Sequence, residues 1–156
     1  LPASASAGIY LGVSSATAAN LLDDYEEGTF NPTITCSSSG SYTTSTAEDT
    51  MAYTKIGRIV HIQGQVSITG ESSPNGQIRV SLPFTTAATA ETSDASAMAC
   101  YLFGHGGSYS QPIGHTEQGE TYFRFFCTAD DGSQFKLEHS HVDTAWKFSV
   151  GGFMIT

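Results

Sequence analysis

The clearest pattern of hydrophobic and polar positions lies in residues 53–69, which read YTKIGRIVHIQGQVSIT. From residue 58 onward apolar residues alternate with polar ones, and Ile59 is the apolar exception on the polar side. The alternation predicts an inward set consisting of Val60, Ile62, Gly64, Val66 and Ile68. A side-chain period of two over so many residues indicates a long β-strand with one dry face and one wetter face.

Shorter apolar patterns predict further strands along the chain. Their ranges are residues 28–36, 51–56, 78–82, 97–103, 122–128, 135–141 and 146–155. In the last of these the apolar series changes phase at Gly151-Gly152, which predicts a β-bulge. Residues rich in Ser, Thr, Gly or Ala predict a surface loop (37–50), a crossover (85–96) and a loop or ragged hairpin (104–119). The acidic run 23–27 predicts a solvated turn.

These elements predict an all-β fold. About eight strands with frequent turn signals and no substantial helix are typical of an antiparallel two-sheet sandwich. A long crossover near the middle favours a jelly roll. We expect residues 1–27 to be an N-terminal connector from a shaft and residues 28–156 to be the jelly-roll domain. Because the first of the 156 residues is Leu and not Met, we expect the chain to be a piece of a longer one.

Two predicted strands, 97–103 and 122–128, are apolar on both faces. In a lone sandwich Tyr101, Phe103, Tyr122 and Phe126 would form a larger exposed patch than monomers normally tolerate. A symmetric oligomer that buries these four side chains explains the pattern. Cover by the crossover or by the N-terminal connector is the alternative.

The charge balance narrows the classes of partner. With 15 acidic and 6 basic residues the net charge is −9, which argues against nucleic acid and against anionic lipid head groups. The three cysteines form no C-x-x-C pair, which excludes zinc ribbons and redox motifs of that type. No apolar run approaches the roughly 20 residues of a membrane span, and no signal peptide is visible.

Three patterns could carry chemistry, and each has a weakness. His139 and His141 on one strand face would be about 7 Å apart and could hold zinc with a third histidine. The HGGS run at 105–108 resembles an esterase oxyanion loop, but no G-x-S-x-G nucleophile motif accompanies it. Glu117 and Glu120 are the best-placed carboxylates for glycoside hydrolysis, although they lie in or next to a loop. We therefore expect no catalytic residue, no metal and no cofactor.

The loops offer better candidates for recognition. Aromatic, imidazole and amide groups among Gly and Ser suit adaptable contacts with sugars or protein loops, although ordinary solvated loops have the same composition. The candidates are Tyr42 in the first loop, and His105, Tyr109, Gln111 and His115 in the second.

Four motifs together resemble a known family. They are LDDYEEGTF (22–30), YTKIGRIVHIQGQVSI (53–68), IRVSLPF (78–84) and FSVGGFMIT (148–156). In this order they resemble C-terminal domains of tailed-bacteriophage fibres and tail-needle knobs. The resemblance implies a trimeric jelly roll of the tumour-necrosis-factor-like or adenovirus-knob kind at the distal tip of a virion appendage. It supplies no catalytic motif, and contact residues in the family lie in variable loops.

The resulting hypothesis is a non-enzymatic tail-tip domain on the virion, a needle knob or fibre head. As a homotrimer joined to an upstream shaft, it would contact a host cell-surface glycan or outer-membrane protein and no nucleic acid. The first alternative is a structural cap that holds the trimeric shaft in register, or a plug that penetrates the envelope without a specific receptor. A glycan hydrolase is the remaining alternative.

Overall fold

The computed structural model describes residues 8–12, 14–15, 21–22, 24–89, 94–107 and 109–156. Its elements are β1 (Ile9–Tyr10), β2 (Leu21–Leu22), β3 (Tyr25–Phe30), β4 (Ile34–Cys36), β5 (Ser39–Thr44), β6 (Met51–Ile56), β7 (Ile59–Asn75), β8 (Ile78–Ser81), β9 (Ser96–Phe103), β10 (Tyr109–Thr116), β11 (Tyr122–Ala129), β12 (Gln134–Lys136), the short 3-10 helix η2 (His139–His141) and β13 (Lys147–Ile155). Among these residues no helix is long and apolar enough to cross a membrane.

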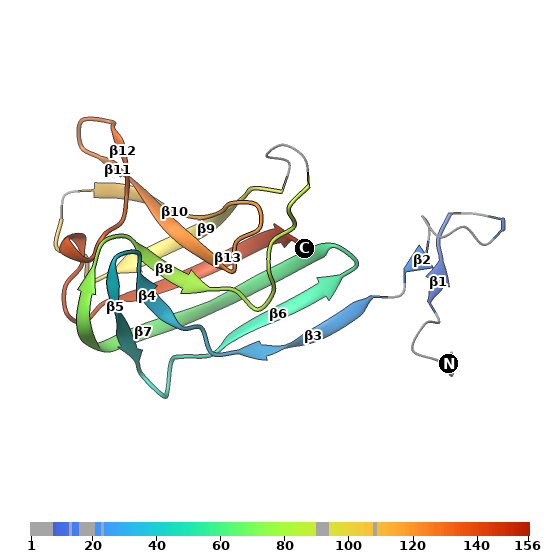
Figure 1. The fold of residues 1–156 in the computed structure, drawn as a ribbon, viewed down its shortest axis with the longest axis horizontal. Helices are drawn as coiled ribbons and strands as arrows, with labels where there is room; N and C mark the ends of the chain where they lie inside the picture. Colours follow the sequence, from blue (N-terminus) through green and yellow to red (C-terminus); the bar gives the residue numbers. More distant parts are fainter. Residues whose placement is uncertain (1–7, 13, 16–20, 23, 90–93, 108) are drawn as a thin grey trace.

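Eleven of the strands form one antiparallel sheet that closes on itself (Figure 1). The closed ring runs β7, β13, β9, β10, β11, β8, β4, β5 and back to β7, while β6 and β3 extend from β7 and β12 pairs with β11. The 17-residue strand β7 makes closure possible because it pairs with β13 along one edge and with β6 and then β5 along the other. The pairing confirms an all-β antiparallel fold and shows a barrel-like sheet. It does not confirm the predicted division into two jelly-roll sheets.

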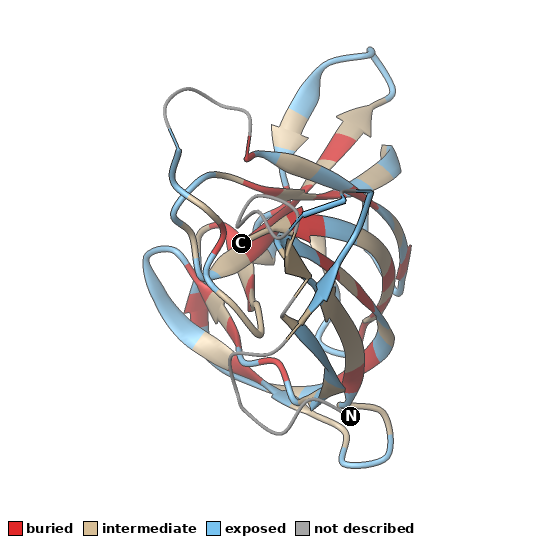
Figure 2. Cartoon of the chain, turned by 90° about the vertical axis from the view of Figure 1, so that its right-hand side faces the viewer, coloured by how far each residue is buried: buried red, intermediate tan, exposed pale blue. Residues whose placement is uncertain are grey.

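The core fills the inside of this barrel. The alternation predicted for β7 is confirmed: Val60, Ile62, Val66 and Ile68 are buried, whereas Ile59 is half exposed. The largest fully buried side chains also include Trp146, Phe123, Phe125 and Phe148. Figure 2 shows buried stretches alternating with exposed ones along the strands, as a half-buried sheet requires.

Several boundaries differ from the sequence prediction. The predicted strand 28–36 is two strands, β3 and β4, separated around Pro32, because proline cannot donate to a sheet ladder. Within the acidic run Tyr25 to Glu27 pair with β6 and so form strand and not a turn, although their side chains are exposed to solvent as predicted; Asp23 lies outside the described residues. The predicted loops 37–50 and 104–119 contain β5 and β10, which pair with β7 and with β9 and β11.

The predicted bulge at Gly151-Gly152 was wrong. Strand β13 pairs with β7 in one continuous register from Lys147 opposite Ser67 to Ile155 opposite Ile59. The inward positions therefore remain in phase through Gly152 to Met154, which is fully buried. Phe153 points outward and is 58% exposed. The apparent phase change in the sequence reflects an apolar outer face at this end of β13.

Candidate functional site

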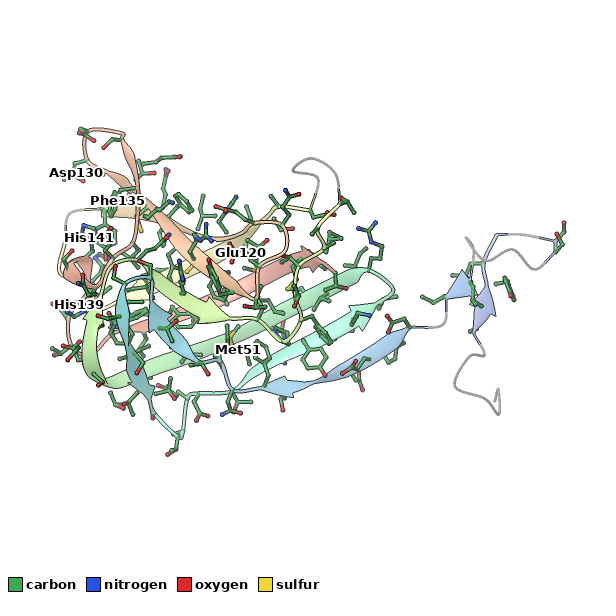
Figure 3. All side chains as sticks on the ribbon, viewed as in Figure 1. Met51, Glu120, Asp130, Phe135, His139 and His141 are labelled. Carbon is green, nitrogen blue, oxygen red and sulfur yellow. The ribbon has the colours of Figure 1, made fainter. Side chains whose placement is uncertain are left out.

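The barrel has two different ends. At one end β3 begins beside the end of β6, since Tyr25 pairs with Ile56, and β13 ends beside the start of β7, since Ile155 pairs with Ile59. We call this the entry end. Helix η2 lies at the opposite end, together with the end of β9 and the start of β13 (Figures 1 and 3). This second end is called the histidine end; it consists of His105, Tyr109, Phe135, His139 and His141.

Tyr109 is the centre of an aromatic cluster at the histidine end. Its ring lies 4.6 Å from the His105 ring and 5.5 Å from the Phe135 ring, and Phe135 lies 4.8 Å from His141. The Tyr109 hydroxyl donates a hydrogen bond to the backbone carbonyl of His141 at 2.8 Å. Burial raises the pKa of Tyr109, so the hydroxyl stays a donor at neutral pH. His105 is the exposed residue of this cluster. Its ring packs on that of Tyr109, which is held in turn by the Phe135 ring and by the hydrogen bond to His141.

A second set of contacts fixes His139. The Tyr42 hydroxyl lies 2.9 Å from His139 Nδ1, and the Glu71 carboxylate lies 3.8 Å from the same nitrogen. Tyr42 also packs edge-on against Trp146, with ring centroids 5.6 Å apart. The prediction that Tyr42 projects from a surface loop was wrong: it is 7% exposed because β5 turns it inward. Tyr42 is therefore a buried residue that holds His139 in position from the core side.

Residues 139–141 were predicted to continue a strand and instead form η2. The backbone N–H of Glu138 donates to His141 Nδ1 at 3.1 Å, so the neutral His141 ring carries its proton on Nε2. The helical turn directs His139 toward Tyr42 and Glu71, and His141 toward Phe135. Within the described residues no group of three or more His, Cys, Asp or Glu side chains could hold a metal ion.

A surface pocket of about 330 Å³ lies beside the histidine end. It is lined by Gln65, Phe103, Gly104, Ala145, Trp146 and Lys147. Glu48 holds its polar side, because one carboxylate oxygen accepts from Lys147 Nζ at 2.6 Å and the other accepts from Gln65 Nε2 at 3.2 Å. The hydrogen bond from Lys147 lowers the pKa of Glu48, so this ion pair is present at neutral pH. The pocket thus combines an exposed aromatic ring with fixed polar groups.

Of the remaining loop candidates, Gln111 follows Tyr109 by two residues on β10, and His115 lies further along the same strand. Gln111 is exposed on β10 in a left-handed backbone conformation, with φ of 52°. His115 is on the outer face of the barrel, opposite Ala97 and Arg124 in the ladder. It lines a second pocket, of about 240 Å³, with Ala97, Ile113, Phe126 and Gln134. The structure therefore brings together His105 and Tyr109, but not the five predicted residues.

The two carboxylates considered for hydrolysis bind one arginine. Arg124, only 8% exposed, donates to the carboxylates of Glu117 and Glu120, the latter at 3.0 Å. The Tyr122 ring lies 5.0 Å from the Arg124 guanidinium and 4.6 Å from that of Arg79. Of the predicted interface residues, Tyr122 is thus engaged by cations and Phe126 lines the second pocket. Tyr101 and Phe103 are 59% and 42% exposed.

Sequence reasoning missed several residues of the site. Phe135, Gln65 and Lys147 were not proposed as site residues, and His141 was considered only as a zinc ligand on a strand. These residues come from different strands, and no local spacing relates them. The β11–β12 pairing and the turn of η2 bring Phe135 and His141 to this end of the barrel, and the pairing of β7 with β13 positions Gln65 and Lys147.

The fold is that of a barrel-like antiparallel domain found in a phage tail protein. The Dettilon tailspike protein (gp208) has a solved structure that matches this chain with a TM-score of 0.64 and 19% sequence identity. The match covers 84% of this chain and 24% of the tailspike chain, so this chain corresponds to about a quarter of it. No family model matches the chain, and no curated protein matches it.

Proposed function

We propose that this chain is a non-enzymatic tail-tip domain of a phage virion that contacts the host cell surface with its histidine end. Two independent likenesses support a phage tail: the four sequence motifs that resemble fibre and needle-knob domains, and the fold shared with part of a tailspike protein. The needle knob and the fibre head are the two forms that the sequence motifs favour.

One observation carries the proposed contact surface. The end opposite the entry of β3, where Figure 3 labels Phe135, His139 and His141, has an exposed imidazole, His105, on a packed aromatic cluster, with an aromatic-walled pocket beside it. A shaft that joins the domain through β3 would leave this end free. Rigid aromatic groups supported from below suit recognition because little side-chain freedom is lost on binding.

Charge restricts the class of receptor. We propose three copies on a shaft, which carry three times −9, or −27, and would be repelled by phosphate-rich surfaces. A neutral sugar or a protein loop fits this charge better. Three weak contacts on one rigid shaft gain strength through avidity.

The proposal includes no catalysis. Glu117 and Glu120 share the guanidinium of Arg124, which is a stabilising arrangement for a nearly buried cation. If these carboxylates hydrolysed a glycan, the wild-type chain would release reducing sugar from host polysaccharide. Glu117→Gln with Glu120→Gln would then abolish that release. We expect no release from the wild-type chain.

The experiment measures binding of the fluorescently labelled chain to intact cells of a strain that the parent phage infects. His105→Ala should weaken binding by at least about fivefold, as expected for a contact residue that contributes more than 1 kcal/mol. Tyr25→Ala is the control, since it removes an exposed ring at the entry end of the barrel, away from the histidine end. Equal binding by both variants and the wild type would overturn the proposal. A chain that binds no cells and only holds a shaft in trimeric register would favour the structural-cap alternative.

A further inference from the structure

Four adjacent strands present an unusually apolar outer surface. On β7, β13, β9 and β10 the outward residues include exposed large hydrophobic side chains from every strand. They are Ile59, Tyr101, Phe103, Ile113 and Phe153, which are 41–59% exposed. We call this surface the acid-free face because the parts of the strands that form it contain no Asp or Glu.

Acidic residues are absent from the parts of these strands that form the face. β9, β10 and β13 contain no Asp or Glu, and β7 has none before Glu71, although the chain has 15 acidic residues. The one Lys or Arg on these parts of the strands is Lys147; it forms an ion pair with Glu48, which lies beside the face and comes from outside these strands, so the two charges neutralise each other. The net charge of −9 is therefore carried by other surfaces. Depletion of charge in an apolar patch is typical of the centre of a protein interface.

The acid-free face also has low and raised regions, a shape that suits packing against another protein surface. Its middle is lined by small residues, since the ladder places Gly151 beside Ala99 and Ala99 beside Ile113. Aromatic pairs stand on this low floor: Tyr101 with Phe103, 4.3 Å between ring centroids, and His61 with Phe153, 4.9 Å apart. At the β10 edge the second pocket adds a hollow of about 240 Å³. Raised rings on one part of the face can seat in the hollow of a neighbouring copy, which is the head-to-tail kind of contact that closes a ring of three.

We infer that a second copy of this chain packs on the acid-free face. Two chains of net charge −9 repel each other, and they meet without acid opposing acid only where the surface lacks carboxylates. A basic partner would be attracted to the acidic surfaces instead. This inference deepens the three-copy arrangement of the proposed function and rests on it. It keeps Tyr101 and Phe103 in the interface, places Phe126 at the hollow on its edge, leaves out Tyr122, and centres the face on Ala99 and Gly151.

The test places one carboxylate in the centre of the face. Ala99 is exposed, so Ala99→Glu should fold, and its far-ultraviolet circular dichroism should equal that of the wild type. Light scattering should give a multiple of the 16.5 kDa chain mass for the wild type and a single chain mass for Ala99→Glu. Thr43→Glu is the matched control, because Thr43 is an exposed strand residue on β5, outside the face. It should keep the wild-type mass.

Two results would overturn the inference: a monomeric wild type, or an Ala99→Glu variant that keeps the wild-type mass. If Ala99→Glu fails to fold, Phe153→Ser replaces it, since Phe153 is 58% exposed and its loss leaves the core intact. Binding to host cells is measured separately with His105→Ala. An oligomer that persists in Ala99→Glu thus refutes the face alone, and cell binding unaffected by His105→Ala refutes the host contact alone.

Discussion

Gly152 lies where the barrel leaves no room for a side chain. A Cβ at this position would be 2.6 Å from Cγ of Met98, 2.8 Å from its Cβ and 2.9 Å from its Cα. Met98 is 1% exposed, and its Cα belongs to the paired strand β9, so the contact cannot be relieved by rotating a flexible side chain. A Cβ on the neighbouring Gly151 would have no atom within 4 Å. The two glycines therefore form a matched pair in one strand.

Replacing each glycine by alanine should separate the packing cost of the added methyl group from its effect on the unfolded chain. Gly152→Ala adds a methyl group to a filled core, which costs about 1–3 kcal/mol. Both variants gain about 0.4–1 kcal/mol because alanine restricts the unfolded chain. The difference between the variants is then the packing cost alone. At about 2–4 °C per kcal/mol for a domain of this size, Gly152→Ala should melt about 2–12 °C below Gly151→Ala.

Urea unfolding followed by circular dichroism measures both variants against the wild type, at a protein concentration where light scattering shows single chains, so that a subunit contact at Gly151 adds nothing. Gly151→Ala should match or slightly exceed the wild type. Equal stability of the two variants would refute the packing argument. A larger loss for Gly151→Ala than for Gly152→Ala would show that β13 is out of phase, as the bulge predicted from sequence would require.

Two further substitutions test buried polar contacts. Tyr42→Phe removes the hydroxyl that contacts His139 and should destabilise the chain by about 0.5–1.5 kcal/mol in urea unfolding, whereas Tyr10→Phe, at an exposed site on β1, should have no effect; equal effects would contradict the role of Tyr42. The Thr89 hydroxyl and N–H both donate to Asp94 and lower its pKa, so its contribution to stability is present above the unfolded pKa of about 3.9 and is lost as the pH falls through the lower folded pKa. Asp94→Asn should therefore lower the urea midpoint at pH 7. Between pH 7 and pH 3 the urea midpoint of the variant should fall by less than that of the wild type; equal falls would contradict this.

The candidate site was only partly predictable. His105 and Tyr109 were found because they lie in one Gly-rich segment, and they do pack together. Tyr42 was misplaced because a Ser- and Thr-rich segment has the composition of a loop even when its backbone pairs with β7. Phe135 joined the cluster through the β11–β12 pairing, which has no signature in the spacing of the residues.

The sequence by itself determined the elements whose pattern is local. The period of two in β7 assigned its inward and outward residues, and the ends of β6 were predicted to the residue, because a half-buried strand sorts its own side chains. The tertiary structure alone decided which strand lies beside which. Pairing of β13 with both β7 and β9 turns Phe153 and Tyr101 to one outer face and brings the start of β13 to the histidine end. Such pairing depends on backbone contacts between distant residues and on the filling of a shared core, and neither is encoded in the order of neighbours along the chain.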